Sequence, residues 1–465
     1  MRPSRIVPLT VATALFMENV DGTVISTSLQ AIAGDFYIEP LSLKLALMSY
    51  MISLAIFIPI SGWVADKFGA KTVFRSALCV FMVGSLACAT AGSLEWFVIA
   101  RFLQGMGGAM MVPVGRLILL RSVPKQEVVQ ALATLTIPAL VGPVIGPPLG
   151  GFITTYFHWR WIFIINLPVA FLGLVLASIF FENIREEEIP PLDFIGFLLS
   201  GFGLALVMLG LATGGRHMMP VGVSILCGII GLICCAGYLL HSRRVAHPVL
   251  KLELLQIKTF RSSVIGAVFF RIGVGAIPFL LPLMLQVGFG LSPLQSGLLT
   301  FISAFGALCS KTVAARILRY FGFRTVLVVN AFIASLFLAA PGLFTPMTPH
   351  WLIMLILFIG GCFRSMQFTS LNALAFADIS KRDMSYATSF SAMMQQVSLS
   401  LGVTVGAFGL ELSQFARGDS QILASDFLPA FFIVAAISAI SGFGFMRLTP
   451  DAGSEMSGHT RNSRK

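Results

Sequence analysis

Residues 15–23 read Leu-Phe-Met-Glu-Asn-Val-Asp-Gly-Thr and place two carboxylic acids in the middle of an apolar run that extends from Ile6 to Leu29. At about 1.5 Å per residue, this run is long enough to cross a hydrocarbon layer of about 30 Å. The acids, Glu18 and Asp21, are spaced i, i+3 and share one face of a helix. Because an aspartate in mid-membrane costs roughly 2.5–3.5 kcal/mol, we expect this face to turn towards water or protein. It then serves either a proton or substrate pathway, or a structural role as an ion pair or as protonated, hydrogen-bonded acids.

Composition places the whole chain in a membrane. The 465 residues are 57% hydrophobic and only 11% charged, with a mean hydropathy of +0.90. Soluble domains are about 25% charged, so a soluble globule is excluded. The seven cysteines fall within apolar runs, with no metal-ligand spacing and no sign of a disulfide framework. A net charge of +11 would suggest nucleic acid as the partner of a soluble protein, but here the basic residues lie mostly in short loops.

Fourteen apolar segments are candidate transmembrane spans, and the basic residues between them predict an orientation. The spans are 6–29, 43–64, 73–92, 95–119, 128–155, 161–181, 194–213, 220–240, 263–288, 293–317, 324–344, 350–376, 385–412 and 427–447. When basic residues near a span end are counted with the nearer loop, three of the 31 lysines and arginines remain within spans, namely Arg101, Arg271 and Arg364. Of the other basic residues, four are predicted to lie on the side of the membrane opposite the N-terminus: Lys44, Arg160, Arg216 and Arg417. Since cytoplasmic loops are enriched in Lys and Arg, we expect both termini in the cytoplasm.

Two spans, 194–213 and 220–240, have no ionisable residue in their cores. Six of the other spans precede these two in the sequence, and six follow them. The sequence therefore predicts an N-terminal six-helix bundle over residues 1–181, a linker with two additional spans over 182–261, a C-terminal six-helix bundle over 262–448, and a cytoplasmic tail over 449–465. Because their cores are apolar all round, the additional spans are predicted to lie outside both bundles.

The loop after the second span contains a dense local motif. Residues 62–75 read Gly-Trp-Val-Ala-Asp-Lys-Phe-Gly-Ala-Lys-Thr-Val-Phe-Arg. The first glycine would let two helices approach closely, the second would permit a turn, and the aspartate could accept from a helix N-terminus. This loop resembles the signature loop of the major facilitator superfamily, although a tight loop with ordinary positive-inside charges is an alternative. The resemblance implies a cytoplasmic gate motif, with Asp66 near Ser385 in the outward-open carrier, and the motif residues are Gly62, Asp66, Lys67, Gly69, Lys71 and Arg75.

A second motif lies in the fourth span, where residues 100–109 read Ala-Arg-Phe-Leu-Gln-Gly-Met-Gly-Gly-Ala. It is similar to the superfamily motif in which an intramembrane arginine is linked to proton movement. We expect Glu18 or Asp21 to carry the coupling proton, with Asp21 the better match to the family's acid, and Arg101 to switch it by approaching or retreating. Two acids one turn apart in a low dielectric make it easier for one of them to hold a proton near neutral pH. A structural cap on a neighbouring carbonyl is the alternative role of the arginine.

Two further strings narrow the resemblance. Residues 142–151 read Gly-Pro-Val-Ile-Gly-Pro-Pro-Leu-Gly-Gly and resemble the antiporter motif of exporters, although a kinked packing seam is an alternative. The motif residues are Gly142, Pro143, Gly146, Pro147, Gly150 and Gly151. Residues 158–168 read His-Trp-Arg-Trp-Ile-Phe-Ile-Ile-Asn-Leu-Pro and, with fourteen spans, are similar to the fourteen-span drug:proton antiporter family. Trp159 and Trp161 also suit an interfacial aromatic belt.

The second half repeats the first weakly. Residues 316–324 follow the tenth span as the gate motif follows the second, with Arg319 in the place of Asp66. Polar residues within spans are expected to line a cavity or to cross-link helices, and the candidate cavity residues are Gln104, Arg271, Gln286, Arg364 and Gln396. Each of the two arginines needs an anion, a carbonyl or a helix end. If an anion is the partner, neutral or anionic amphiphiles are expected to be better substrates than quaternary ammonium dyes.

Other chemistry is not indicated. The sequence has no Walker loop, its glycine strings lie in apolar helices, and its histidines show no metal-ligand pattern. We therefore expect no enzyme, no cofactor and no nucleic-acid partner. The predicted function is proton-coupled efflux of small amphipathic or drug-like molecules by a monomer in the lipid bilayer of a bacterial-type inner membrane, energised by the proton gradient. The alternatives are an exporter or importer of a polar or anionic metabolite, and a non-transporting membrane sensor.

Overall fold

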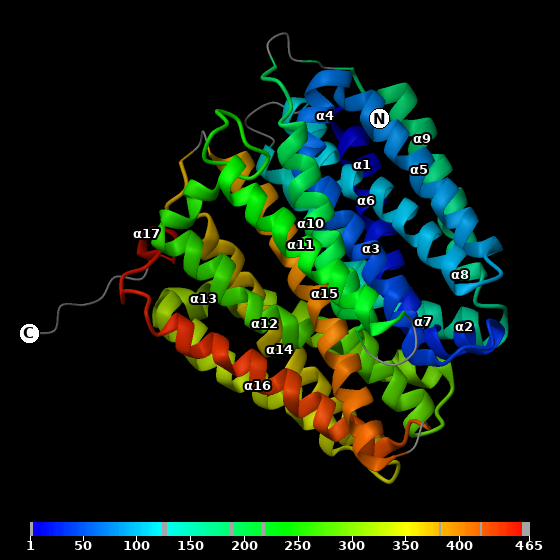
Figure 1. Ribbon diagram of the computed structural model, residues 1–465. Coiled ribbons are helices and arrows are strands. Elements are labelled where there is room, and N and C mark those ends of the chain that lie inside the picture. Colours follow the sequence, from blue (N-terminus) through cyan, green and yellow to red (C-terminus); the bar gives the residue numbers. More distant parts are fainter. Residues whose placement is uncertain are drawn as a thin grey trace, which may run out of the picture. The chain divides into compact units, whose positions relative to one another are not determined.

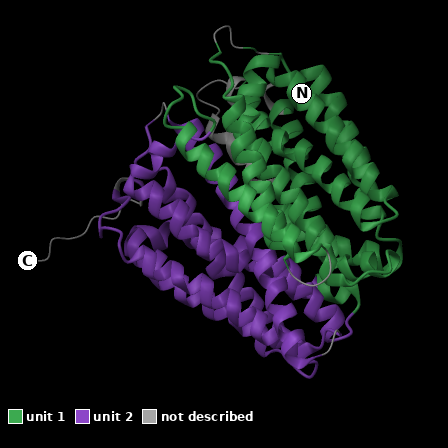
Figure 2. Ribbon diagram, viewed as in Figure 1, with its two compact units in different colours: residues 1–249, 292–297 green, residues 250–291, 298–465 purple. Residues whose placement is uncertain are grey.

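The computed structural model describes residues 3–122, 128–183, 185, 189–214, 219–380, 383–418 and 421–457. In these residues the chain forms helices and connecting turns and contains no strand (Figure 1). A helix satisfies its backbone donors and acceptors within one segment, which is why apolar spans of this length become helices in a membrane. Two compact units can be separated, residues 1–249 with 292–297 (unit 1) and residues 250–291 with 298–465 (unit 2), as Figure 2 shows.

Unit 1 is built from eleven α-helices in the described part of the chain. They are α1 (Pro3–Val24), α2 (Leu29–Asp35), α3 (Lys44–Phe57), α4 (Ser61–Phe68), α5 (Ala70–Thr90), α6 (Leu94–Ser122), α7 (Val128–Tyr156), α8 (Trp161–Ile164), α9 (Asn166–Phe180), α10 (Phe194–Thr213) and α11 (Val221–His241). Short α8 leads directly into α9, so the predicted span 161–181 is made of both.

Unit 2 contains the remaining long helices. They are α12 (Lys258–Leu283), most of α13 (Pro293–Ala339), α14 (His350–Ala375), α15 (Met384–Arg417), α16 (Phe427–Phe445) and the short α17 (Ser454–Ser457). A π-helical turn over Met284–Gly288 follows α12. The division between the units at residue 249 falls within the predicted linker 182–261.

The number of spans agrees with the predicted fourteen. Among the described residues, eleven helical segments are long and apolar enough to cross a membrane. One of them, Pro293–Leu343, joins two helices across Gly322 and so accounts for both predicted spans 293–317 and 324–344. Helices α1 and α7 correspond to the two remaining predicted spans, 6–29 and 128–155. The protein is an all-α integral membrane protein.

The backbone preserves the weak internal repeat. Gly69, between α4 and α5, has φ 91° and ψ 132°, and Gly322, within α13, has φ 73° and ψ 163°. Residues with a side chain rarely adopt such angles, so a glycine is needed at each turn. The gate motif and its counterpart after the tenth span therefore share a helix–glycine–helix geometry.

The two additional spans form a hairpin within unit 1. Helix α10 packs against α11 and α3. A hydrogen bond of 2.9 Å joins Thr213 and Ser224 at one end of the hairpin, and one of 2.7 Å joins His241 Nε2 and Asp193 Oδ1 at the other. Helix α11 exposes apolar side chains along its whole length, including Val221, Ile225, Ile229, Leu232, Ile233 and Leu240. Such a surface is suited to lipid.

Candidate functional site

The carboxylate of Asp21 is the centre of a buried polar cluster in unit 1. Arg101 Nη1 donates to Asp21 Oδ2 at 2.7 Å, and Gln104 Nε2 donates to Asp21 Oδ1 at 2.8 Å. Asn166 Nδ2, from the first residue of α9, donates to the same Oδ1 at 2.7 Å. None of these four side chains is more than 3% exposed. Charge-assisted hydrogen bonds of this number and length are what a buried, ionised carboxylate requires.

A second layer of contacts holds the two α6 side chains. Gln104 Oε1 accepts from Arg101 Nη1 at 2.6 Å, and Gln104 Nε2 donates to Ser85 Oγ on α5 at 2.8 Å. The guanidinium of Arg101 lies 4.3 Å from the centre of the Tyr50 ring, within cation–π distance. Arg101 Nε has no hydrogen-bond partner among the described residues. The sequence predicted Gln104 as a cavity residue, but its amide is used within the Asp21 cluster.

Glycines bring the helices of this cluster close together. A Cβ atom on Gly84 of α5 would lie 2.6 Å from the backbone nitrogen of Gln104, and one on Gly107 of α6 would lie 2.6 Å from that of Phe81. A Cβ on Gly105 would lie 2.7 Å from the carbonyl oxygen of Tyr50 on α3. Larger residues would push α3, α5 and α6 apart. The small residues of the predicted arginine motif therefore set the distances at which its polar residues meet Asp21.

Glu18 lies beside this cluster in a different environment. It is half-buried, and its hydrogen bond in the described part of the chain is a long one, 3.5 Å from Tyr50 OH to Glu18 Oε1. Since Tyr50 also covers Arg101, this ring connects the two acids of α1 to the arginine. The structure thus brings together Glu18, Asp21 and Arg101, the three residues predicted for proton coupling.

The gate motif forms the end of α4 and the start of α5. Asp66 is half-buried, while Lys67 is exposed and lies 5.6 Å from the centre of the Trp63 ring. At Gly69 an added Cβ would collide with the Asn183 side chain. Of the other basic residues, Lys71 is half-buried and Arg75 is exposed. The expectation that Gly62 permits a close helix approach is wrong, because an added Cβ would find nothing within 4 Å.

The antiporter motif lies on α7, where Gly142, Gly146 and Gly150 face α1 and the turn after it, and Gly151 faces the first residues of α13. A Cβ on Gly142 would lie 2.8 Å from Asn19 Cβ, and one on Gly146 would lie 2.9 Å from Thr23 Cβ. On Gly150 it would lie 2.6 Å from Thr27 Oγ1. The same end of α7 meets the first residues of α13, where Leu294 N donates to Thr155 Oγ1 at 3.1 Å. Pro143, Pro147 and Gly151 lie in the same stretch of α7, which contains three prolines of the motif and is tightly packed.

One set of contacts in unit 1 was missed by sequence reasoning. Arg160 Nη1 donates to Asp35 Oδ2 at 2.6 Å, and Arg160 Nη2 donates to the carbonyl of Ala91 at 3.0 Å. Trp159 is only 3% exposed, and its Nε1 donates to Asp35 Oδ2 at 3.3 Å. The interfacial-belt prediction is therefore wrong for Trp159, although Trp161 is 52% exposed. The string at 158–168 joins α2, α5 and α8, and its Asn166 reaches Asp21.

The other candidate cavity residues lie in unit 2 and have few partners. Arg271 on α12 is 1% exposed, and its Nη2 donates to Asn372 Oδ1 on α14 at 3.3 Å. Arg364 on α14 is half-buried and donates to Ser303 Oγ. Among the described residues, neither arginine is hydrogen-bonded to a carboxylate or a backbone carbonyl, so of the expected partners the carbonyl is not found there. Gln286 is buried in the π-helical turn, and Gln396 is half-buried on α15.

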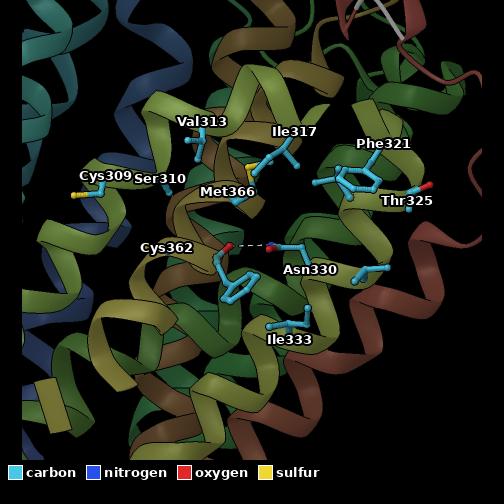
Figure 3. Close-up of a pocket in the computed structure, with 13 residues that line it drawn as sticks. Cys309, Ser310, Val313, Ile317, Phe321, Thr325, Asn330, Ile333, Cys362 and Met366 are labelled. Atoms are coloured by element: carbon cyan, nitrogen blue, oxygen red, sulfur yellow. Dashed lines mark hydrogen bonds between the residues drawn. The ribbon is translucent and has the colours of Figure 1, made fainter. Parts of the chain in front are cut away.

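Unit 2 also has an apolar pocket of about 540 Å³ between the two limbs of α13 and α14. Figure 3 shows Asn330 against its wall, where Asn330 Nδ2 donates to the carbonyl of Phe363 at 2.8 Å. The lining includes Cys309, Val313, Ile317, Phe321, Cys362 and Met366, and none of the predicted cavity residues. Because Val313, Phe321 and Val329 are exposed, the pocket opens at the surface of the helices.

Ionisable residues buried within the spans of a multi-pass helical protein, as in the Asp21–Arg101 pair, are typical of membrane transporters. The chain belongs to the Major Facilitator Superfamily, whose sequence pattern it matches over residues 11–240, 192–403 and 263–462.

Relatives and solved structures agree with this assignment. The chain is 37% identical to a Haemophilus influenzae protein named transport protein HsrA, over 92% of this chain and 93% of the relative. It is 34% identical to a Serratia proteamaculans protein named multidrug resistance protein MdtD, over 95% of this chain and 93% of the relative. Its fold is similar to that of a POT family peptide transporter, with a TM-score of 0.70 at 16% identity over 99% of both chains. A D-xylose–proton symporter gives a TM-score of 0.68 at 14% identity over 96% of this chain and 98% of the other.

Proposed function

We propose that this transporter is a proton-coupled exporter of small amphipathic molecules, with both termini in the cytoplasm of a bacterial cell and the helices in its inner membrane. The observation on which the proposal depends is the hydrogen-bonded cluster of Asp21, Arg101, Gln104 and Asn166, with Glu18 one turn away. A carrier driven by protons needs an acid whose charge can be removed and a partner that responds to the removal. The names of the MdtD relatives support drug-like cargo, and the likeness of residues 142–151 to the antiporter motif supports export.

The cluster suggests how a proton changes the carrier. When Asp21 is ionised, the guanidinium of Arg101 and the two amides are held around it. Protonation removes the charge, so Arg101 loses its ionic partner and the arrangement of α1, α6 and α9 becomes less favourable. The released arginine still has the Tyr50 ring beside it, 4.3 Å from its guanidinium. Two arrangements of one buried network, biased by a proton, are sufficient to couple proton and substrate movement.

A flux measurement in proteoliposomes with an imposed pH gradient tests this proposal. The wild type should accumulate a lipophilic dye in response to the gradient, whereas the double variant Glu18→Gln, Asp21→Asn should not. Glu95→Gln is the matched control, because Glu95 is an exposed acid at the start of α6. A double variant that still builds a dye gradient would exclude these acids as the coupling site. Absence of substrate flux in the wild type, over a panel of neutral, anionic and cationic compounds, would favour the non-transporting sensor.

A polar or anionic metabolite remains the alternative cargo. The observation that favours it is the presence of Arg271 and Arg364 in unit 2 with only neutral partners among the described residues. The same proteoliposomes distinguish the two classes of cargo, since an anionic metabolite should then compete with the dye.

A further inference from the structure

The helices of unit 2 provide almost no negative charge. The sequence from Leu254 to Ala377, which includes α12, α13 and α14, contains no aspartate or glutamate. Helix α16 has none, and α15 has only Glu411. The acids near the helix ends already have other partners, since Asp378 accepts from Thr259 and Asp383 accepts from Lys251. A cation buried in this unit therefore has no nearby carboxylate to neutralise it.

Arg271 is such a cation. Its side chain is 1% exposed, and neither Nε nor Nη1 has a hydrogen-bond partner in the described residues. Its remaining contacts are neutral, namely Asn372 Oδ1 at 3.3 Å and the Phe368 ring, whose centre is 6.0 Å from the guanidinium. A buried guanidinium without an ionic partner is strongly unfavourable unless an anion joins it. Two unused N–H-bearing nitrogens are thus available to a ligand.

Further amide groups lie around this arginine. Asn372 is exposed, so the amide that contacts the buried Arg271 reaches the surface of the helices. When Asn372 Oδ1 accepts from Arg271, its NH₂ group remains a donor. A Cβ on Gly275 of α12 would lie 2.6 Å from Leu399 Cα on α15, which fixes where the two helices touch.

The opposing helix presents two more amides at this level. A Cβ on Gly402 would lie 2.9 Å from Ala276 N, and one on Gly406 would lie 3.1 Å from Leu280 Cγ, so residue numbers rise together along the two helices. The helices are therefore parallel. Arg271 lies four residues before Gly275 on α12, and Gln395 lies four residues before Leu399 on α15, so the two lie at the same level. Both Gln395 and the adjacent Gln396 are half-buried, and their side chains make no hydrogen bond to other described residues.

We propose that Arg271 is the charged end of an anion-binding site in unit 2, and that the site takes amphipathic molecules that bear a single carboxylate. Asn372 supplies a neutral donor, and Gln395 or Gln396 contacts the polar groups next to the carboxylate. The predominantly apolar faces of α12 and α15 suit the rest of such a molecule. That this is a substrate site rests on the proposed transport function. The binding itself can be measured without transport.

Thermal unfolding of the purified full-length protein in detergent provides the test, with sodium benzoate as the probe. Benzamide is the neutral isostere, and sodium chloride at equal ionic strength is the inorganic anion. Benzoate should raise the unfolding temperature in a saturable way, more than benzamide or chloride does. Arg271→Gln should weaken benzoate binding at least about tenfold, because the charge that pairs with the carboxylate is lost. Arg316→Gln should leave binding unchanged, since Arg316 is an exposed arginine on α13.

A second variant keeps the test decisive if Arg271→Gln does not fold. Asn372→Asp places a carboxylate next to Arg271 and so supplies the missing anion from within the protein. It should raise the unfolding temperature without ligand and abolish the response to benzoate. Equal responses to benzoate and benzamide, an unchanged response in Arg271→Gln, or a destabilised Asn372→Asp that still binds benzoate would each overturn the proposal. An equal response to chloride would overturn the assignment to carboxylate amphiphiles.

The two proposals fail in different ways. If the wild type does not bind benzoate, the proposed anion site is excluded, whereas the proposal of proton-driven export still stands. Dye export that persists in the double variant of Glu18 and Asp21 would remove the proton-coupling proposal and leave benzoate binding untouched.

Discussion

Asp21 receives three N–H donors, whereas Glu18, one turn earlier on α1, has one long hydrogen bond from Tyr50. Protonating Asp21 disrupts an extended network, while protonating Glu18 disturbs a single contact. We therefore expect Glu18 to exchange its proton with the least rearrangement and Asp21 to convert a change of charge into a change of structure. Family resemblance alone favoured Asp21 as the proton carrier, and the contacts give the two acids separate roles to test.

Asn166 allows the network to be tested at one position. In Asn166→Leu, Asp21 loses one donor while the branched shape of the side chain is kept, so we expect unfolding to become easier by about 1–3 kcal/mol. Proton-driven export should fall as well, because the ionised carboxylate is less well held. Ser178→Ala on the same helix is the control, since that hydroxyl donates to the carbonyl of Leu174 within its own helix. A variant at Asn166 with wild-type unfolding and export would show that this amide has no positioning role.

The residue scale also shows what the sequence could not provide. The acid, the arginine and the string that ends at Asn166 were all recognisable, but they come from α1, α6 and α9, and spacing cannot show which side chains meet across helices. The burial of Trp159 was missed for the same reason. Its partner Asp35 stands outside every motif, and a tryptophan near a span end fits a lipid interface equally well when its neighbours are unknown.

At the scale of elements, helix packing in unit 1 depends on positions that lack a side chain. Gly142, Gly146 and Gly150 recur every four residues on α7 and lie against α1, the helix of the two acids. The tight-packing role was predictable from the sequence pattern, but the choice of α1 as the partner was not. Because this contact borders the Asp21 cluster, the antiporter motif can set the position of α1 through packing alone.

Substitution at the seam tests its packing role. In Gly146→Ala the new Cβ would meet Thr23, so we expect a loss of about 1–3 kcal/mol in stability from overpacking, with reduced export. Gly228→Ala on α11 is the control, because nothing lies within 4 Å of the added atom. Unfolding temperatures and flux of the two variants should therefore separate. Equal stability of both variants would mean that α1 and α7 can move apart at no cost.

At the scale of the whole molecule, the gate motif is expected to bias one state of the carrier. Asp66 is a half-buried acid of α4, and the family resemblance predicts that it approaches the N-terminus of α15, near Ser385, in the outward-open state. A carboxylate at a helix N-terminus contributes about 0.3–1 kcal/mol, so Asp66→Asn should change the balance of states roughly two- to fivefold. Export should weaken while the amount of protein in the membrane stays normal. Wild-type flux in Asp66→Asn would speak against a gating role.

The number of spans is a property of the whole chain. It could be predicted from the sequence because the thickness of the lipid layer sets how long an apolar segment must be to cross it. Even the merged helix α13 fits, since Gly322 separates its two spans as Gly69 separates α4 from α5. Gly62 was misjudged because a glycine in an apolar helix has the same appearance whether it faces a neighbour or open space. Which helices pack against each other therefore could not be predicted from the sequence and is seen only in the three-dimensional structure.

The distribution of charge between the units leads to a prediction about cargo. Charges near span ends and Lys311, whose long stem can reach the cytoplasm, are set aside. The acids Glu18 and Asp21 and the base Arg101 then lie in unit 1, whereas Arg271 and Arg364 lie in unit 2 with neutral partners among the described residues. A desolvated cation needs an opposite charge beside it, and the helices of unit 2 provide almost none. We therefore expect neutral and anionic amphiphiles to be exported better than quaternary ammonium dyes. Export of an anionic compound should fall in Arg271→Ala and Arg364→Ala by more than the loss of protein explains, while export of a neutral analogue of the same skeleton should fall less. Strong export of ethidium-like cations, unchanged in both variants, would contradict a cargo preference set by these arginines.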